Sequence, residues 1–151
     1  MMPEDIYDSM WAKVTGDILT GCIAVTKEIY DEMRHIPGQI GACIKSNEAR
    51  MVLEVGKKGW NWEPYVKCAE DMQISQRAFI SEYNGGSKRT VCLNDISIIA
   101  LAKVLALPVV SMEALIRQPE AKWRRIPNVC LAENVEHLWF NDFLRRENVR
   151  L

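Results

Sequence analysis

A chain of 151 residues, of which 48% are hydrophobic, is long enough to bury a core and is about the size of one domain. We therefore expect residues 1–151 to form a single domain. Lysine and arginine (19 residues) nearly balance aspartate and glutamate (20 residues), which excludes a chain-wide attraction to nucleic acid or anionic lipid. Any site for a polyanion must be local.

The cysteines and the N-terminal segment indicate a cellular compartment. The five cysteines are an odd number without a Cys-x-x-Cys pair, so neither a disulfide framework nor a zinc ribbon is predicted, and we expect reduced, mostly buried thiols. The N-terminus carries acids where a signal peptide needs basic residues. The most apolar stretch, 96–112, is interrupted by Lys103 and Pro108 and is too short to span a bilayer. We therefore expect a cytoplasmic protein with no membrane partner.

The N-terminal half is predicted to be mostly helical. Apolar residues recur at spacings of three to four from Asp5 to Leu19, and Gly21 ends this amphipathic helix. Residues 22–25 form either a brief strand or an extended segment. Thr26 can then cap a second helix that runs to about His35.

A third, longer helix is expected from Ile40 to Val55, ended by Gly56 and Gly59. One or two further helices follow between Tyr65 and Tyr83. The segment Asn84-Gly-Gly-Ser87 is the clearest break in the sequence, and the pattern changes after it.

The C-terminal half is predicted to be α/β. A short apolar run over Thr90–Leu93, a helix over Ile96–Ala102 and a buried strand over Leu107–Ser111 follow one another. This order is typical of a right-handed βαβ unit with parallel strands. Three further elements are expected: a short helix over Ile126–Cys130, a strand over Val135–Trp139 and a final helix over Phe140–Glu147.

Two acids fall where functional groups gather in a parallel sheet. Asp95 lies at the helix start after the first apolar run, and Glu113 lies two residues past the strand that ends at Ser111, so both can face the carboxyl ends of the strands. Glu32, on the second helix, is a third candidate whose approach to that edge cannot be judged from spacing.

Clustered carboxylates without a nearby histidine or cysteine are the ligands of a hard cation such as Mg²⁺ or Mn²⁺. Such a cation can lower the pKa of a bound water and neutralise charge on a scissile phosphate. The residues alone leave the alternatives open: Asp95 as a helix cap, and Glu113 and Glu32 as solvated surface acids.

Lys57 and Lys58 precede Trp60 and Trp62, and together they could form a stacking and phosphate-binding surface for single-stranded RNA. The alternative is that one tryptophan packs on the helices and that the lysines are solvated.

The pair Arg124 and Arg125 can line an RNA path or act as a partner of a helix dipole. His35 and His137 have no metal-site spacing, and we expect each at a helix end or on the surface.

The segment Leu93-Asn-Asp95-Ile-Ser-Ile-Ile-Ala-Leu-Ala102 is followed by Leu107-Pro-Val-Val-Ser111-Met-Glu113. An aspartate that opens an alanine-rich helix, then a strand, then Thr-x-Asp or Thr-x-Glu is the pattern of PIN-domain (VapC-type) ribonucleases, which this region resembles. Further segments resemble one uncharacterised PIN-like bacterial family of unknown function: 3–6, 10–11, 21–25, 29–33, 125–130 and 140–146.

The resemblance implies a three-layer α/β/α fold around a small parallel sheet. It implies that Glu32, Asp95 and Glu113 are catalytic acids of a Mg²⁺ or Mn²⁺ site, and that Ser111, where the family prefers threonine, hydrogen-bonds a carboxylate or a metal-bound water. The implied function is an endoribonuclease of the toxin–antitoxin type, with RNA and an antitoxin protein as partners. A non-catalytic PIN-fold protein that binds a protein or RNA is the alternative, and an α/β domain with coincidental acids is a third.

Family members open with a central strand that carries Asp-Thr/Ser-x-x-Phe/Leu-Ile, whereas this chain opens at Met1-Met2-Pro3, past that strand. We therefore expect a sheet without its first strand, and a site that binds Mg²⁺ weakly and cleaves RNA slowly or not at all. The open strand edge would be a template for a second chain, so a homodimer is a further expected partner. The alternative is that the natural start lies upstream.

Overall fold

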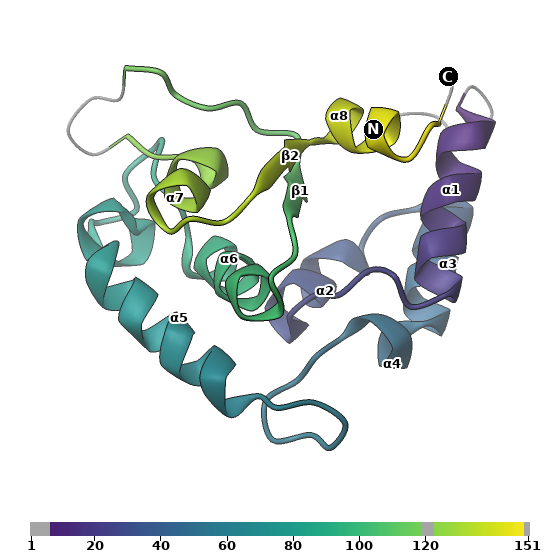
Figure 1. The fold of residues 1–151 in the computed structure, drawn as a ribbon, viewed down its shortest axis with the longest axis horizontal. Coiled ribbons are helices and arrows are strands. Elements are labelled where there is room, and N and C mark those ends of the chain that lie inside the picture. The colour runs from purple at the N-terminus through teal and green to yellow at the C-terminus, as the bar shows by residue number, and fades with distance from the viewer. Residues whose placement is uncertain (1–6, 119–122, 150–151) are drawn as a thin grey trace. The chain divides into compact units, whose positions relative to one another are not determined.

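The computed structural model describes residues 7–118 and 123–149. Helices dominate these residues, and the strands are short (Figure 1). The chain divides into two compact units, of which the second comprises Val55–Phe140. The first unit extends to Glu54 and resumes at Asn141, so it is built from both ends of the chain.

The first unit is helical, which confirms the prediction for the N-terminal half. Its helices are α1 (Asp8–Leu19), α2 (Lys27–Met33), α3 (Gly38–Ser46), α4 (Glu48–Met51) and, from Asn141 onward, α8 (Phe140–Arg146). The buried apolar side chains of this unit include Met10, Ile18, Tyr30, Ile40, Ile44, Met51 and Leu144. The predicted start of the first helix, Asp5, lies outside the described residues, and its predicted end at Leu19 is confirmed.

The cap predicted for α2 is confirmed. The hydroxyl of Thr26 accepts a hydrogen bond from the backbone N–H of Ile29 at 3.3 Å and is almost completely buried. An N-cap of this kind satisfies one of the free donors at the start of a helix and stabilises it by about 1 kcal/mol. The helix ends at Met33, two residues before the predicted end at His35.

The predicted continuous helix from Ile40 to Val55 is wrong. The helix breaks at Asn47, whose side-chain amide donates to the carbonyl of Cys43 at 2.7 Å, and a short helix α4 follows. Val52 then adopts an extended conformation and forms a parallel bridge with Val25. Two backbone hydrogen bonds hold this bridge, so a contact between distant residues overrides the helical periodicity.

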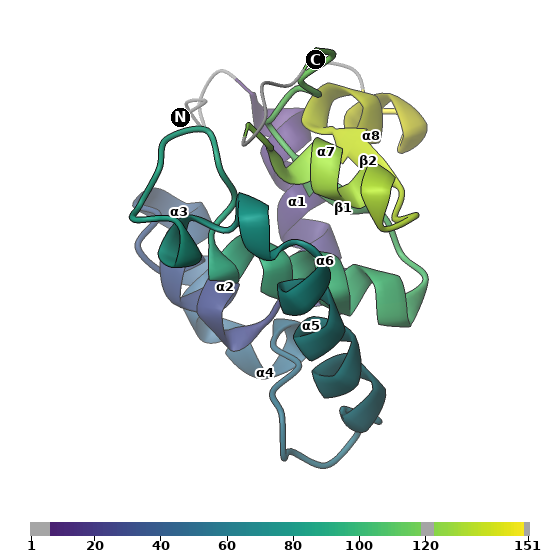
Figure 2. The same ribbon diagram turned by 90° about the vertical axis from the view of Figure 1, so that its left-hand side faces the viewer.

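The second unit packs helices against a small sheet. Its elements are α5 (Glu63–Ser75), the 3₁₀ turns η1 (Arg77–Phe79) and η2 (Ser81–Tyr83), α6 (Leu93–Leu105), β1 (Val109–Ser111), α7 (Ile126–Ala132) and β2 (His137–Trp139). Helices α5 and α6 pack side by side (Figures 1 and 2). Six residues of α6 are buried, which confirms that this helix is apolar on most sides. Fully burying an isoleucine such as Ile96 or Ile99 contributes about 1.5–3 kcal/mol each.

The two strands form a parallel pair, with Val109 opposite His137 and Ser111 opposite Trp139. The strands expected in 107–111 and 135–139 are therefore confirmed, each shorter than predicted. The expected βαβ unit over residues 90–111 is wrong, because residues 90–93 do not pair with β1 among the described elements. Val91 instead forms an isolated parallel bridge with Ile80, and the crossover between the paired strands contains α7.

The fold class is therefore mixed α/β with a small parallel sheet. Helix α6 and strand β1 are consecutive elements joined by residues 106–108, and they contact each other. None of the helices in the described ranges is long and apolar enough to cross a membrane.

Candidate functional site

Asp95 lies in the first turn of α6 and caps it. One of its carboxylate oxygens accepts a hydrogen bond from the backbone N–H of Cys92 at 2.9 Å, and the residue is half-buried. The helix-cap alternative considered for Asp95 therefore describes its geometry correctly. A carboxylate offers about four acceptor directions, so one backbone hydrogen bond does not exhaust its capacity to bind a cation.

Glu113 lies two residues past β1 and reaches the start of α7. Its Oε2 accepts from the backbone N–H of Ile126, the first residue of α7, at 2.9 Å. The residue is half-buried, so the alternative of a freely solvated surface acid is wrong for Glu113. Strand β1 and helix α7 together fix the position of this carboxylate.

Ser111 connects Glu113 to a histidine. The Ser111 hydroxyl accepts from the backbone N–H of Glu113 at 3.2 Å, and it lies 2.7 Å from Nε2 of His137 on the neighbouring strand. Burial lowers the pKa of His137, and the nearby charge of Glu113 opposes this shift only in part. A neutral imidazole can accept a hydrogen bond from the Ser111 hydroxyl. This bond orients the hydroxyl oxygen for its contact with the backbone N–H of Glu113.

The expectation that His137 lies at a helix end or on the open surface is wrong. It is half-buried in β2, and the parallel register of β1 and β2 brings it to Ser111. The sequence signal that could have found it is the pairing of two short strands, Val109–Ser111 and His137–Trp139.

The structure thus brings Ser111, Glu113 and His137 into contact and places Asp95 in the same unit. Glu32 is an exposed residue of α2 and belongs to the first unit. Within residues 7–118 and 123–149, no group of three or more histidine, cysteine, aspartate or glutamate side chains could hold a metal ion. Mg²⁺ commonly binds one or two carboxylates and completes its shell with water and substrate phosphate.

The predicted RNA-binding residues have different environments. Lys57 and Lys58 are exposed, and the Trp60 ring packs on Tyr65 with a centroid distance of 5.7 Å, as the packing alternative predicts. Arg124 is half-buried over a phenylalanine ring, and Arg125 is the exposed residue that precedes α7. Of these four basic residues, Arg124 and Arg125 are the ones that directly precede Ile126, whose backbone N–H donates to Glu113.

All five cysteines are free, but the expectation of mostly buried thiols is wrong, because only Cys130 is fully buried and Cys22 is exposed. Burial raises the pKa of Cys92 to about 11 and that of Cys130 to about 12. Both thiols therefore stay protonated at neutral pH and are poor nucleophiles.

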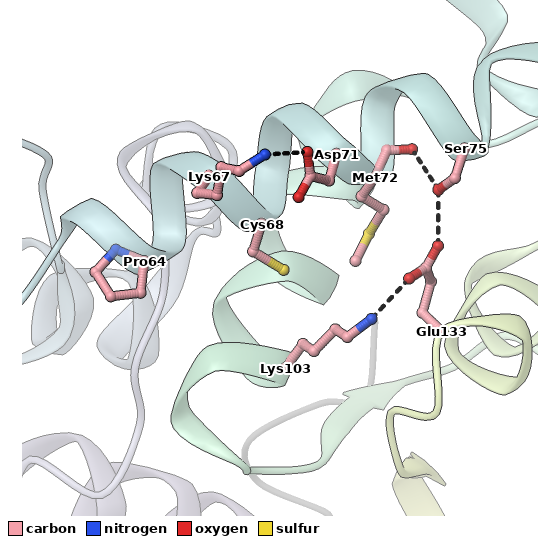
Figure 3. Close-up of a pocket in the computed structure, with 8 residues that line it drawn as sticks. All are labelled: Pro64, Lys67, Cys68, Asp71, Met72, Ser75, Lys103 and Glu133. Atoms are coloured by element: carbon pink, nitrogen blue, oxygen red, sulfur yellow. Dashed lines mark hydrogen bonds and ion pairs between the residues drawn. The ribbon is translucent and has the colours of Figure 1, made fainter.

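An open pocket of about 510 Å³ lies between α5, α6 and the end of α7 (Figure 3). Glu133 at its edge accepts hydrogen bonds from Ser75 at 3.0 Å and Gln76 at 2.8 Å, and it forms an ion pair with Lys103 at 2.9 Å. Burial alone would raise the pKa of Glu133, but these donors outweigh burial and hold the pKa below its usual value. This carboxylate joins three helices and is structural.

Comparison with curated proteins and with solved structures gave no significant match. One protein family, described as a domain of unknown function (DUF4411), matches residues 2–151, which is nearly the whole chain. Its description assigns no activity. The chain belongs to this DUF4411 family.

Proposed function

We propose that this chain is a PIN-like endoribonuclease of the toxin–antitoxin type that depends on Mg²⁺ or Mn²⁺. One observation carries the proposal: Glu113 is held at the start of α7 beside Ser111 and His137, in the same unit as Asp95 at the start of α6. The resemblance of these two segments to the PIN pattern, and a three-layer PIN arrangement, remain part of the proposal.

In this proposal Asp95 and Glu113 hold the cation. The bound ion would supply a water of lowered pKa and neutralise charge on the scissile phosphate. Ser111 and His137 act as positioning residues, because their hydrogen bonds fix the backbone at Glu113. Glu32 is proposed as a third acid, RNA as the substrate and an antitoxin protein as the partner that blocks the site.

A non-catalytic RNA-binding or protein-binding role is the second candidate. It is favoured by a specific observation: Asp95 and Glu113 each already accept a backbone hydrogen bond as part of a helix start. In that case the acids would stabilise α6 and α7, and no cation would be needed.

Cleavage of single-stranded RNA with Mn²⁺, by the wild-type chain and by Asp95→Asn, separates the two candidates. Asparagine preserves the acceptor that caps α6, so the variant should fold, and we expect its cleavage rate to fall at least about a hundredfold, since even residues outside a metal's ligand set change metal affinity by about 10–100-fold. Equal cleavage by both proteins would exclude Asp95 from catalysis. No Mn²⁺-dependent cleavage by the wild-type chain would favour the binding role.

A further inference from the structure

Three arginines of the second unit stack on aromatic rings. The pairs, with the distance from arginine Cζ to ring centroid, are Arg89 on Trp123 (3.9 Å), Arg124 on Phe79 (4.1 Å) and Arg77 on Tyr83 (4.7 Å). We call these six residues the arginine surface. Contact with a ring holds a guanidinium in place, and N–H groups at its edge can donate to a phosphate. In Arg124 one of these groups also donates to the carbonyl of Trp123 at 2.7 Å.

Backbone hydrogen bonds connect the segments that carry the arginine surface. Val91 exchanges hydrogen bonds with the segment 79–81, since its N–H donates to Phe79 at 3.0 Å and its carbonyl accepts from Ser81 at 2.7 Å. On the other side, the N–H of Arg124 donates to the carbonyl of Arg89 at 2.7 Å. Three segments that are distant in sequence therefore lie next to one another.

The arginine surface carries net positive charge. Within residues 7–118 and 123–149, no carboxylate forms an ion pair with Arg77 or Arg89. Glu82, the acid of the neighbouring turn, instead accepts hydrogen bonds from the N–H of Leu93 at 2.9 Å and from the hydroxyl of Ser81 at 2.7 Å. Its charge is thus directed to the start of α6.

Arg89 occupies a backbone position that favours glycine. Its φ is 65°, in the left-handed region, where a side chain costs conformational energy. A glycine at this position would adopt the same backbone conformation without that cost, which makes Arg89→Gly a substitution that removes the side chain without disturbing the turn.

The arginine surface adjoins both candidate acids along the chain. Val91 precedes Cys92, whose N–H binds Asp95, and Arg124 and Arg125 precede Ile126, whose N–H binds Glu113. Residues of the arginine surface are therefore close in the chain to the backbone groups that hold both acids.

We propose that the arginine surface binds single-stranded RNA, with the guanidinium edges on its phosphates and the exposed flat groups against its bases. This inference rests on the proposed function for the identity of the strand. Single strands are bound by combining positive charge with aromatic or guanidinium stacking, which this surface provides. An acidic protein would need the charge but not the stacked planes.

The test measures binding of a fluorescent single-stranded RNA to the full chain in EDTA, so that no cleavage occurs. Arg89→Gly removes the guanidinium and also relieves the left-handed backbone, so we expect the variant to unfold at or near the wild-type temperature yet to bind about tenfold more weakly. Arg124→Gln should weaken binding similarly, and the slope of log affinity against log salt should fall by about 0.7 for each lost phosphate contact.

Arg145→Gln is the matched control. It removes one arginine charge from an exposed side chain that is paired with Asp142 at 2.6 Å, and we expect RNA affinity to change less than about twofold. Equal affinities of wild type, Arg89→Gly and Arg124→Gln would overturn the proposal. Equal loss in Arg145→Gln would also overturn it, since binding would then report net charge alone.

Competition with polyglutamate identifies the partner class. We expect it to displace the RNA far less well than unlabelled RNA does, and equal displacement would overturn the assignment to a nucleic-acid strand. These binding measurements need no metal, so they are independent of the cleavage assay. RNA binding that depends on Arg89, together with no cleavage in Mn²⁺, would overturn the proposed nuclease activity and support RNA binding by the arginine surface.

Discussion

A glutamate carboxylate lies at each end of α7: Glu113, from the segment after β1, at the start, and Glu133, the C-cap, at the end. The two carboxylates are held in different ways. At the N-terminal end, Glu113 accepts one backbone hydrogen bond, from Ile126, and lies beside Ser111. At the C-terminal end, Glu133 accepts from Ser75 and Gln76 and pairs with Lys103.

The helix dipole explains part of this difference. A carboxylate is stabilised at a helix N-terminus and destabilised at a C-terminus, so Glu133 needs three side-chain donors where Glu113 needs one backbone N–H. Glu133 is thereby committed to structure. Glu113 retains acceptor capacity beside Arg124 and Arg125, so we propose it, and not Glu133, as a cation ligand.

The largest expected effect separates the two glutamates by activity. Glu113→Gln should lower Mn²⁺-dependent RNA cleavage at least about a hundredfold, because an amide is a weaker ligand of a hard cation than a carboxylate. Glu133→Gln should leave the rate within about threefold at a temperature where both variants are folded. Cleavage assays on the two purified variants check this, and the reverse pattern would show that the functional carboxylate is at the other end of α7.

The second effect separates them by stability. Glu133→Ala removes the acceptor of Lys103 and Gln76, whereas Ser75 keeps the Met72 carbonyl as an acceptor. We expect a loss of about 1–2 kcal/mol in the free energy of unfolding, moderated by the partial exposure of Lys103. Urea unfolding at unchanged m-value measures it. Glu70→Ala, an exposed substitution on α5, serves as control and should cost less than about 0.5 kcal/mol. An equal cost in both variants would mean that the Glu133 network contributes nothing.

The third effect concerns the contact that positions Glu113. Ser111→Ala removes the hydroxyl between His137 and Glu113 and should weaken Mn²⁺ binding about tenfold, as loss of a supporting hydrogen bond at a metal site does. Ser111→Thr keeps the hydroxyl and should restore the affinity, which a purely structural loss would not predict. Calorimetric titration with Mn²⁺ distinguishes these outcomes, and identical affinities in all three proteins would contradict the positioning role.

The smallest effect is the pH dependence of the Glu133 network. Its donors lower the pKa of Glu133 in the folded state, so its stabilisation is complete above the unfolded carboxyl pKa of about 4.3 and is lost as the pH falls through the lower folded value. The stability difference between wild type and Glu133→Ala should stay constant from about pH 6 to 8 and shrink below about pH 4. A difference that grows on acidification would contradict the direction of this shift.

Local signals in the sequence predicted several elements well. The Thr26 cap, the apolar helix after Asn94 and Asp95, and the short helix from Ile126 all depend on residues within one or two turns. The two acids of the second unit were found for the same reason, because each marks a local boundary of a helix or strand.

The remaining features depend on contacts between distant residues, which periodicity does not encode. The bridge between Val25 and Val52 broke a predicted helix, and Val91 pairs with Ile80 and not with β1. His137 was assigned to the surface because its contact with Ser111 requires the register of β1 and β2.

The proposal that Asp95 and Glu113 hold a divalent cation can be tested through the two histidines of the chain. Bound Mn²⁺ broadens nearby proton NMR signals, and the imidazole of His137 contacts Ser111 beside Glu113. His35→Gln assigns the two signals. We predict that substoichiometric Mn²⁺ broadens the His137 signal in the wild type but not in the Asp95→Asn, Glu113→Gln double variant. A His137 signal that stays sharp at Mn²⁺ concentrations supporting cleavage would contradict the proposal.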